Sequence, residues 1–189
     1  MKKLGVFVIF CFLLASPCFG ITLLLKEEAF YQNCPDPERM EERKVIASEE
    51  KIASIKKQLG GKLTHILNKE AQEINQKKEF TFYYCCKDKE EMDISLILDE
   101  PGKWGLIKFL ICLNPGGEVK KVNVLEYQEA RGRPIAAQSF LRQFEGKNIN
   151  SPLKIGKDIQ GITGATVSSE AVCFAVKKAV VLYKELALK

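Results

Sequence analysis

The sequence predicts a single α+β domain, with a mainly antiparallel sheet packed by helices, an amino-terminal helical segment and a long carboxy-terminal helix. Three patterns lead to this class. Residues 23–78 are rich in Lys, Glu and Gln with apolar residues at helical spacing, the next fifty residues contain strand-like runs, and the chain closes on a long apolar helical stripe. A chain of 189 residues with 46% hydrophobic content is expected to bury one core.

Residues 1–20 have the order of a secretory signal peptide. Two lysines are followed by an apolar run and then by small and turn-forming residues that end at Gly20. We expect cleavage after Gly20, which would leave the protein extracytoplasmic, either periplasmic or anchored in the membrane and facing outward. The alternative is that the apolar stretch, prolonged through Leu25, stays as an uncleaved membrane anchor, although Pro17 and Gly20 interrupt it.

Residues 21–78 are interpreted as an amino-terminal segment of two or three helices. Ser48 is positioned to cap one of them, and its apolar face would carry Ile52, Ile55 and Leu59. Gly60-Gly61 would end that helix, and the Pro-containing residues 33–37 would separate it from the preceding one. The charged faces of these helices are expected to be solvated.

Residues 79–189 are expected to form the sheet and the last helix. Strands are predicted within residues 80–84 and 94–98, and residues 105–127 should form a hairpin around the turn at 114–117. A short helix is expected at 139–144. Ser168 or Ser169 would cap the final helix, which should pack on the sheet through an apolar stripe of Val172, Val176, Ala179, Val180 and Tyr183.

Charge and metal-binding chemistry exclude several functions. The formal charge is +5 and falls to about +3 without the two lysines of the signal, which is too mild to indicate nucleic-acid binding, and no nucleic-acid motif is present. His65 is the single histidine, and in so charged a segment it is expected to be solvated. It cannot build a metal site alone, so no metal site is predicted.

Five of the seven cysteines lie after the signal segment. An odd number leaves at least one thiol if the others pair. Cys85 and Cys86 are adjacent, and a disulfide between neighbours is strained, so we expect none between them. Cys112 and Cys173 lie in apolar runs and are interpreted as core residues.

Residues 161–169, immediately before the final helix, are rich in small and hydroxyl-bearing side chains. Small residues let a ligand approach the backbone, hydroxyls offer an attachment atom, and a helix N-terminus stabilises a phosphate. On the residues alone, a stretch of this kind is most often only a helix cap.

Thr163-Gly164-Ala165-Thr166, followed by Ser168-Ser169, resembles the flavin-attachment motif of the FMN-binding domain family. That family includes the flavin-carrying subunits of sodium-pumping NADH:quinone reductases and of ion-pumping ferredoxin oxidoreductases. The resemblance covers roughly residues 101–183, including a Glu-containing turn at Glu129. It departs from the family at Gln160, where Asp is usual, and at Ala130, where Thr is usual.

The resemblance implies that FMN is joined covalently to Thr166 through a phosphoester. A separate flavin transferase, using FAD and magnesium, would make the bond, so the acceptor needs no base of its own. Ser168, Ser169 and the first three motif residues, Thr163, Gly164 and Ala165, would complete the cofactor site. Trp104 would stack on the flavin ring or serve as a rim aromatic, and Glu129 would shape the site or form a surface ion pair.

The leading hypothesis is an extracytoplasmic electron carrier rather than an enzyme with its own substrate, with no catalytic residues and a place in an oxidoreductase complex. Its partners would be the flavin transferase and a membrane or periplasmic redox protein. Two alternatives stay open: a module that holds or senses FMN without a covalent bond, and a secreted scaffold whose flavin site has decayed. A self-sufficient reductase is disfavoured because no nicotinamide-binding motif is present.

Overall fold

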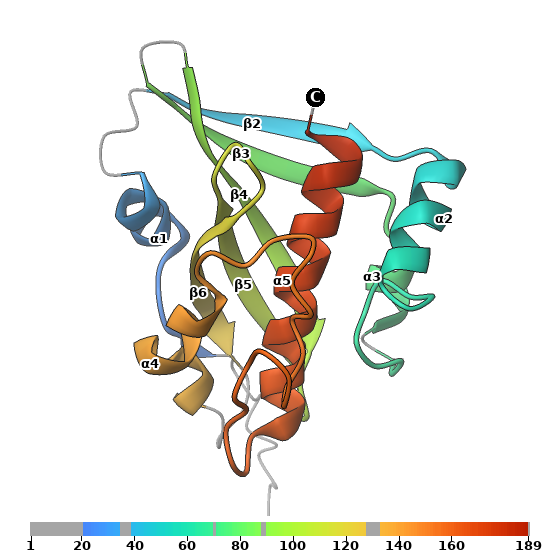
Figure 1. Ribbon diagram of the computed structural model, residues 1–189, viewed down its shortest axis with the longest axis vertical. Coiled ribbons are helices and arrows are strands. Elements are labelled where there is room, and N and C mark those ends of the chain that lie inside the picture. The colour runs from blue at the N-terminus through green and yellow to red at the C-terminus, as the bar shows by residue number, and fades with distance from the viewer. Residues whose placement is uncertain (1–20, 35–38, 70, 88–89, 128–132, 189) are drawn as a thin grey trace, which may run out of the picture.

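The computed structural model describes residues 21–34, 39–69, 71–87, 90–127 and 133–188. Within these ranges the chain forms one six-stranded sheet in the order β1-β6-β5-β4-β3-β2, and every neighbouring pair is antiparallel (Figure 1). The strands are β1 (Ile21–Thr22), β2 (Arg39–Ile46), β3 (Glu79–Lys87), β4 (Glu90–Pro101), β5 (Leu106–Leu113) and β6 (Val119–Tyr127). Because β3 to β6 follow one another as hairpins, the sheet is a meander extended at both edges.

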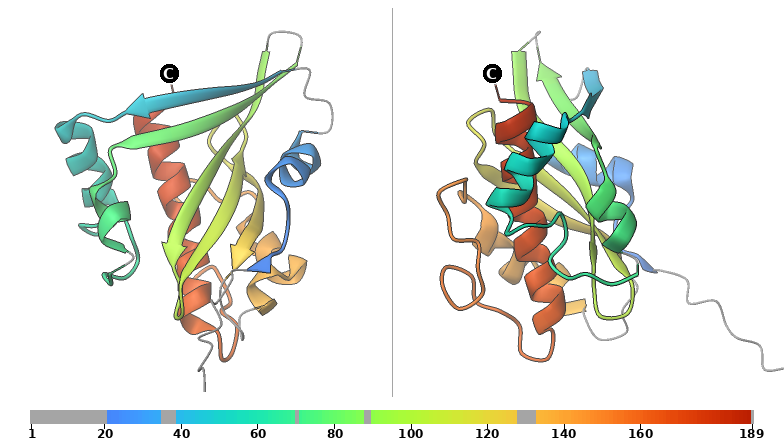
Figure 2. Two further views of the ribbon diagram at one scale, coloured as in Figure 1. Left: turned by 180° about the vertical axis from the view of Figure 1, so that it is seen from behind. Right: turned by 90° about the vertical axis from the view of Figure 1, so that its right-hand side faces the viewer.

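Helices cover both faces of this sheet. The long α5 (Thr166–Leu186) crosses one face with α2 (Glu49–Gln58) beside it, as Figures 1 and 2 show. The main core lies between them and the sheet, and α1 (Lys26–Asn33) covers a smaller core on the other face. The remaining helical elements are α3 (Ala71–Gln76), α4 (Gln138–Leu141) and the 3₁₀ turns η1 (Arg133–Ala136) and η2 (Arg142–Phe144). The α+β class and the long carboxy-terminal helix are therefore confirmed.

The strand β5 shows why both faces need a cover. Phe109 and Ile111 belong to the core beneath α5, whereas Leu110 packs with Phe30 of α1 and Leu125 of β6. Successive residues of a strand point to opposite faces, so the continuous apolar run of β5 must be buried on two sides.

The expected start of α2 and end of the same helix are confirmed. The Ser48 hydroxyl accepts the backbone N–H of Lys51 at 3.3 Å, and Gly60 and Gly61, both at positive φ, follow the helix. Ile52, Ile55 and Leu59 are all buried in the main core. The hairpin of β5 and β6 and the short helix around 139–144 also form as predicted.

The strand β2 was missed in the segment expected to contain only helices. It pairs with β3 along its whole length, from Arg39 opposite Cys86 to Ile46 opposite Glu79. The side chains of residues 40–46 are exposed or half-buried and mostly charged, which is typical of an edge strand and hides the alternation that marks strands elsewhere. Arg43 stabilises this edge, because its guanidinium stacks on the Tyr84 ring at 4.0 Å and bonds the carboxylate of Glu41 at 2.7 Å.

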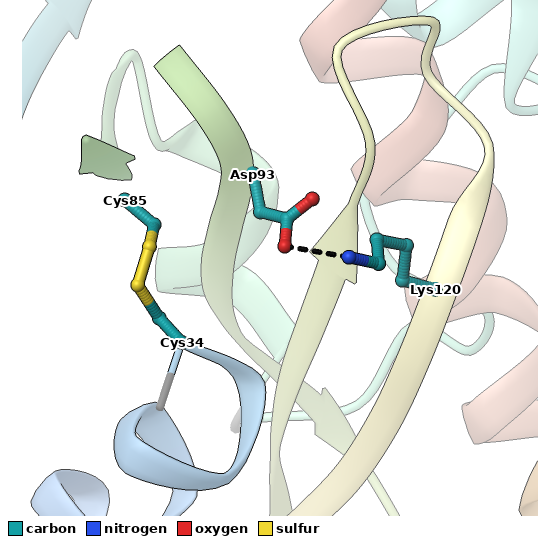
Figure 3. Close-up of a disulfide and its surroundings, with 4 residues drawn as sticks. All are labelled: Cys34, Cys85, Asp93 and Lys120. Atoms are coloured by element: carbon teal, nitrogen blue, oxygen red, sulfur yellow. Dashed lines mark hydrogen bonds and ion pairs between the residues drawn. A yellow bond between two sulfur atoms is a disulfide. The ribbon is translucent and has the colours of Figure 1, made fainter. Parts of the chain in front are cut away.

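A disulfide joins Cys34, just after α1, to Cys85 in β3 (Figure 3). The prediction that Cys85 does not pair with Cys86 is confirmed. Cys112 and Cys173 are buried, and desolvation raises the pKa of the Cys112 thiol to about 11 and that of Cys173 to about 12. Both thiols are therefore uncharged at neutral pH and act as core residues, as expected.

The expectation of a solvated His65 is wrong. Its side chain is 6% exposed, and its Nδ1 lies 3.3 Å from Oε2 of the fully buried Glu100. The backbone N–H of His65 donates to the same carboxylate oxygen at 3.2 Å. The connection between α2 and α3 folds over the end of the sheet, and this long-range packing removes the histidine from water.

Candidate functional site

The candidate site lies at the N-terminus of α5, and the loop that leads into it is held by Asp158. This carboxylate accepts the backbone N–H groups of Leu153 at 3.2 Å and Lys154 at 3.0 Å, and it forms an ion pair with Lys147 at 3.1 Å. Burial alone would raise the pKa of Asp158, but these hydrogen bonds and the Lys147 ammonium outweigh it and hold the pKa below its usual value. Asp158 therefore acts as a structural anion for the loop.

Gln160 is held through its backbone by Gln143 of η2. The side-chain amide of Gln143 accepts the Gln160 N–H at 2.8 Å and donates to the Gln160 carbonyl at 3.2 Å. The Gln160 side chain itself is not used in these bonds, and the residue is exposed. The replacement of the family's usual Asp by Gln160 thus leaves the loop anchored.

The turn into the helix is made by Gly164 and Ala165. Gly164 has φ of +80°, a conformation that residues with a Cβ adopt only with strain, and an added Cβ would meet no other atom there. The N–H of Ala165 closes the turn on the carbonyl of Ile162 at 3.0 Å. Glycine is needed at this position for its backbone conformation rather than for space.

The final helix begins at Thr166, earlier than predicted, and the expectation that Ser168 or Ser169 caps it is wrong. Ala165 occupies the N-cap position, without a capping side-chain hydrogen bond. Ser169 is fully buried, and its hydroxyl donates to the Ala165 carbonyl at 2.9 Å while accepting the N–H of Ile162 at 3.2 Å. The serine joins the two sides of the turn from inside the first helical turn, a use of its hydroxyl that depends on tertiary packing.

Thr166 is exposed at the first position of α5. The N–H groups of the first helical turn have no acceptor within the helix and carry its positive dipole end. In the described part of the chain, the N–H groups of Thr166 and Val167 form no backbone hydrogen bond. A phosphate attached to this threonine would lie next to these donors.

A pocket of about 340 Å³ opens beside Thr166. Its walls are Lys103 and Trp104, from the turn between β4 and β5, together with residues 164–168. Trp104 is 68% exposed, and the Lys103 ammonium lies 5.2 Å from the centre of its ring. The fold thus brings an aromatic face and a cation from one turn against the start of α5.

Some of the predicted site residues line this pocket and others do not. Trp104, Gly164, Ala165, Thr166 and Ser168 line this pocket. Thr163 is exposed but is not in the pocket wall, Ser169 is buried behind it, and Glu129 lies outside the described residues. Lys103 was not predicted, although its position next to Trp104 was the signal that could have indicated it.

These residues fit FMN. The helix N-terminus and Lys103 suit a phosphate, the exposed Trp104 ring suits a flat aromatic ring, and Thr166 offers an accessible hydroxyl at the boundary between them. Fold and site together define an α+β domain with a pocket that suits a phosphate and a flat aromatic ring at the start of its last helix. The model of the FMN-binding domain family matches residues 102–181, which is less than half of the chain. The resemblance found in the sequence is confirmed.

A curated relative of this chain is one of the subunits of the proton-translocating ferredoxin:NAD(+) oxidoreductase complex of Clostridium ljungdahlii. The two are 31% identical over 115 residues, which is 57% of this chain and 60% of that protein. The match therefore spans well under the full length of the relative. Among solved structures, NqrC of Shewanella oneidensis is similar with a TM-score of 0.48 and 13% identity, over 82% of this chain and 70% of that chain.

Proposed function

We propose that this protein is an extracytoplasmic electron carrier that holds FMN covalently on Thr166. One observation supports the attachment residue above all. Of the four hydroxyls in residues 163–169, that of Thr166 alone belongs to a residue that is exposed and also lines the pocket beside Trp104. Thr163 lies off the pocket, and Ser168 and Ser169 are buried.

The geometry supports a division of labour between the chain and the cofactor. FMN, once bound, supplies the one- and two-electron chemistry, and the protein supplies position and electrostatics. Thr166 would hold the phosphate by a phosphoester formed by a flavin transferase, Lys103 and the start of α5 would balance its charge, and Trp104 would cover the ring. A second pocket, further along α5, shares no lining residue with this one.

The compartment and the partners form part of the same proposal. The disulfide between Cys34 and Cys85 supports an oxidising environment, as the signal-like residues 1–20 do. No helix in the described part of the chain is both long and apolar enough to cross a membrane. The relation to a component of a proton-translocating oxidoreductase complex supports electron transfer to another protein, of the membrane or periplasm, within such a complex.

Co-expression with a flavin transferase tests the attachment. The protein should give a band that fluoresces after denaturing electrophoresis, and its intact mass should rise by one FMN residue. Thr166→Ala should abolish the fluorescence while the fold is kept, whereas Thr163→Ala should weaken labelling without removing it, because that side chain supports the loop only.

The result also separates the remaining functions. If the protein is yellow but releases its flavin on denaturation, the covalent carrier is ruled out, and a module that binds or senses FMN without a covalent bond is favoured. If the protein stays colourless although the transferase is active, the remaining hypothesis is a scaffold whose flavin site has decayed. Covalent flavin on Thr166→Ala would refute the assignment of this residue.

A further inference from the structure

A second pocket, of about 430 Å³, lies on the same side of α5 as the flavin pocket but further along the helix. We call it the lysine pocket, because Lys62, Lys154 and Lys177 line it from three different segments. Glu170 is its only acidic lining residue among the described ones. Glu170 follows Thr166 by one helical turn, so the two pockets are neighbours on one helix face.

The charge of the lysine pocket is unbalanced. The Lys62 ammonium donates to the backbone carbonyl of His65 at 2.5 Å, so it is held near the pocket wall. Neither Lys154 nor Lys177 has a carboxylate within ion-pair distance in the described ranges of the chain. Three ammonium groups facing one carboxylate create a positive potential inside a concave surface, and such a potential attracts an anion.

One lining residue of the pocket, His65, carries a buried polar atom without a partner in the described part of the chain. His65 lines the pocket with a side chain 6% exposed, and its Nδ1 is engaged by Glu100. Its other ring nitrogen, Nε2, is buried and has no hydrogen-bond partner among the described residues. A buried nitrogen of this kind costs free energy unless something binds to it. A carboxylate ligand would satisfy it by binding together with one proton from the solvent, and that proton would then lie between the carboxylate and Nε2.

The rest of the wall is apolar. Leu59 of α2, Leu153 and Ile155 of the loop before α5, and Phe174 of α5 contribute carbon surface. A bare inorganic ion would leave this surface exposed to water, whereas a ligand with an apolar body would cover it. We propose that the lysine pocket binds a small organic anion, with a carboxylate held by the lysines and His65 and an apolar body against Phe174.

The single histidine makes the test direct, because every imidazole signal in an NMR spectrum of the protein belongs to His65. Benzoate is the probe, added to the flavinylated protein carried on a tag without histidine. Benzyl alcohol serves as the uncharged comparison, and inorganic phosphate as the anion without a body. Benzoate should shift the His65 ring signals in a saturable way and should bind at least about tenfold more tightly than either comparison ligand.

Variants that remove one charge from the lysine pocket test whether electrostatic attraction holds benzoate. Lys177→Gln should weaken benzoate binding by about threefold or more, and Glu170→Gln should strengthen it, because one removes an attracting charge and the other a repelling one. Lys184→Gln is the matched control, since Lys184 is exposed on α5 outside the pocket and its change should leave the affinity as it is. Backbone amide spectra of each variant establish that the fold is retained.

Four outcomes would overturn the proposal. Benzyl alcohol binding as tightly as benzoate would make the pocket a plain apolar groove, and phosphate binding as tightly would remove the role of the apolar body. Unchanged His65 signals at saturating benzoate would place the ligand elsewhere. Flavin-free protein provides a further check: if benzoate binds there but is lost on flavinylation, the flavin itself fills the pocket and a separate site is excluded.

Discussion

The ammonium of Lys178, in the middle of α5, forms an ion pair with the carboxylate of Glu100 at the end of β4, and both side chains are almost completely buried. The same ammonium donates to the carbonyls of Leu63 at 3.1 Å and Asp99 at 3.3 Å. Glu100 in turn holds His65. One buried charge pair therefore connects α5, the sheet and the segment between α2 and α3.

This pair predicts a strong dependence of stability on either partner alone. Lys178→Met or Glu100→Leu should each lower the free energy of unfolding by about 3–5 kcal/mol, because the remaining charge stays buried without compensation. The double variant Lys178→Met with Glu100→Leu should recover much of that loss, but not all, since His65 loses its acceptor. Urea unfolding of the four proteins measures this coupling. Additive losses in the double variant would show that the two groups do not form a pair.

The disulfide between Cys34 and Cys85 should contribute about 2–4 kcal/mol to the stability of the folded protein. It joins residues 51 positions apart, so its removal by Cys34→Ser frees a long loop of the unfolded chain. Cys86→Ser is the matched control and should change stability much less. Rapid alkylation of Cys34 in the native, non-reduced protein would contradict the pairing.

The lowered pKa of Asp158 predicts that the loop before the candidate site loses its hydrogen bonds in acid. Because its pKa is lower in the folded protein than in the unfolded chain, its contribution to stability is present above the unfolded value of about 4 and is lost as the pH falls through the folded pKa. The protection of the Leu153 and Lys154 amides, measured as their exchange rate relative to the intrinsic rate at each pH, should therefore fall on acidification. In Asp158→Asn the protection of the same amides should already be low at neutral pH, with little further change in acid. Equal acid sensitivity in wild type and variant would assign the effect to another group.

Gly164 should tolerate asparagine better than valine. Its positive φ suits Asn, which adopts the left-handed conformation more readily than other residues, and strains β-branched side chains, although no atom would block either one. With a flavin transferase, Gly164→Val should be labelled slowly and Gly164→Asn at a rate closer to wild type. The band intensity over time after denaturing electrophoresis measures both. Equal loss in the two variants would mean that side-chain bulk, rather than backbone conformation, is decisive.

Export predicts a specific amino terminus. Sequencing of the mature protein should begin near Ile21, because residues 1–20 have signal-peptide order. Full-length protein with Met1, recovered from the cytosol, would remove the basis for an extracytoplasmic redox partner. Full-length protein in the membrane fraction would instead support the uncleaved anchor.

Local patterns predicted those parts of the molecule in which neighbours in sequence are neighbours in space. Ser48 caps α2 through a residue three positions away, and the turn at 114–117 joins β5 to β6 directly. The start of α5 was misplaced because several hydroxyls compete near it, and local rules cannot rank them. Packing turned Ser169 inward onto Ala165, so the helix begins at Thr166 instead.

By itself, the sequence determined the α+β class, the strands β3 to β6 and the family motif around Thr166, because each depends on periodicity or on a contiguous run of residues. The tertiary structure alone decided that Cys34 meets Cys85 across 51 positions, that His65 meets Glu100 across 35, and that Trp104 lines the pocket of Thr166. Such contacts leave no periodic trace in the chain, since each partner is chosen by how the helices settle on the two faces of the sheet.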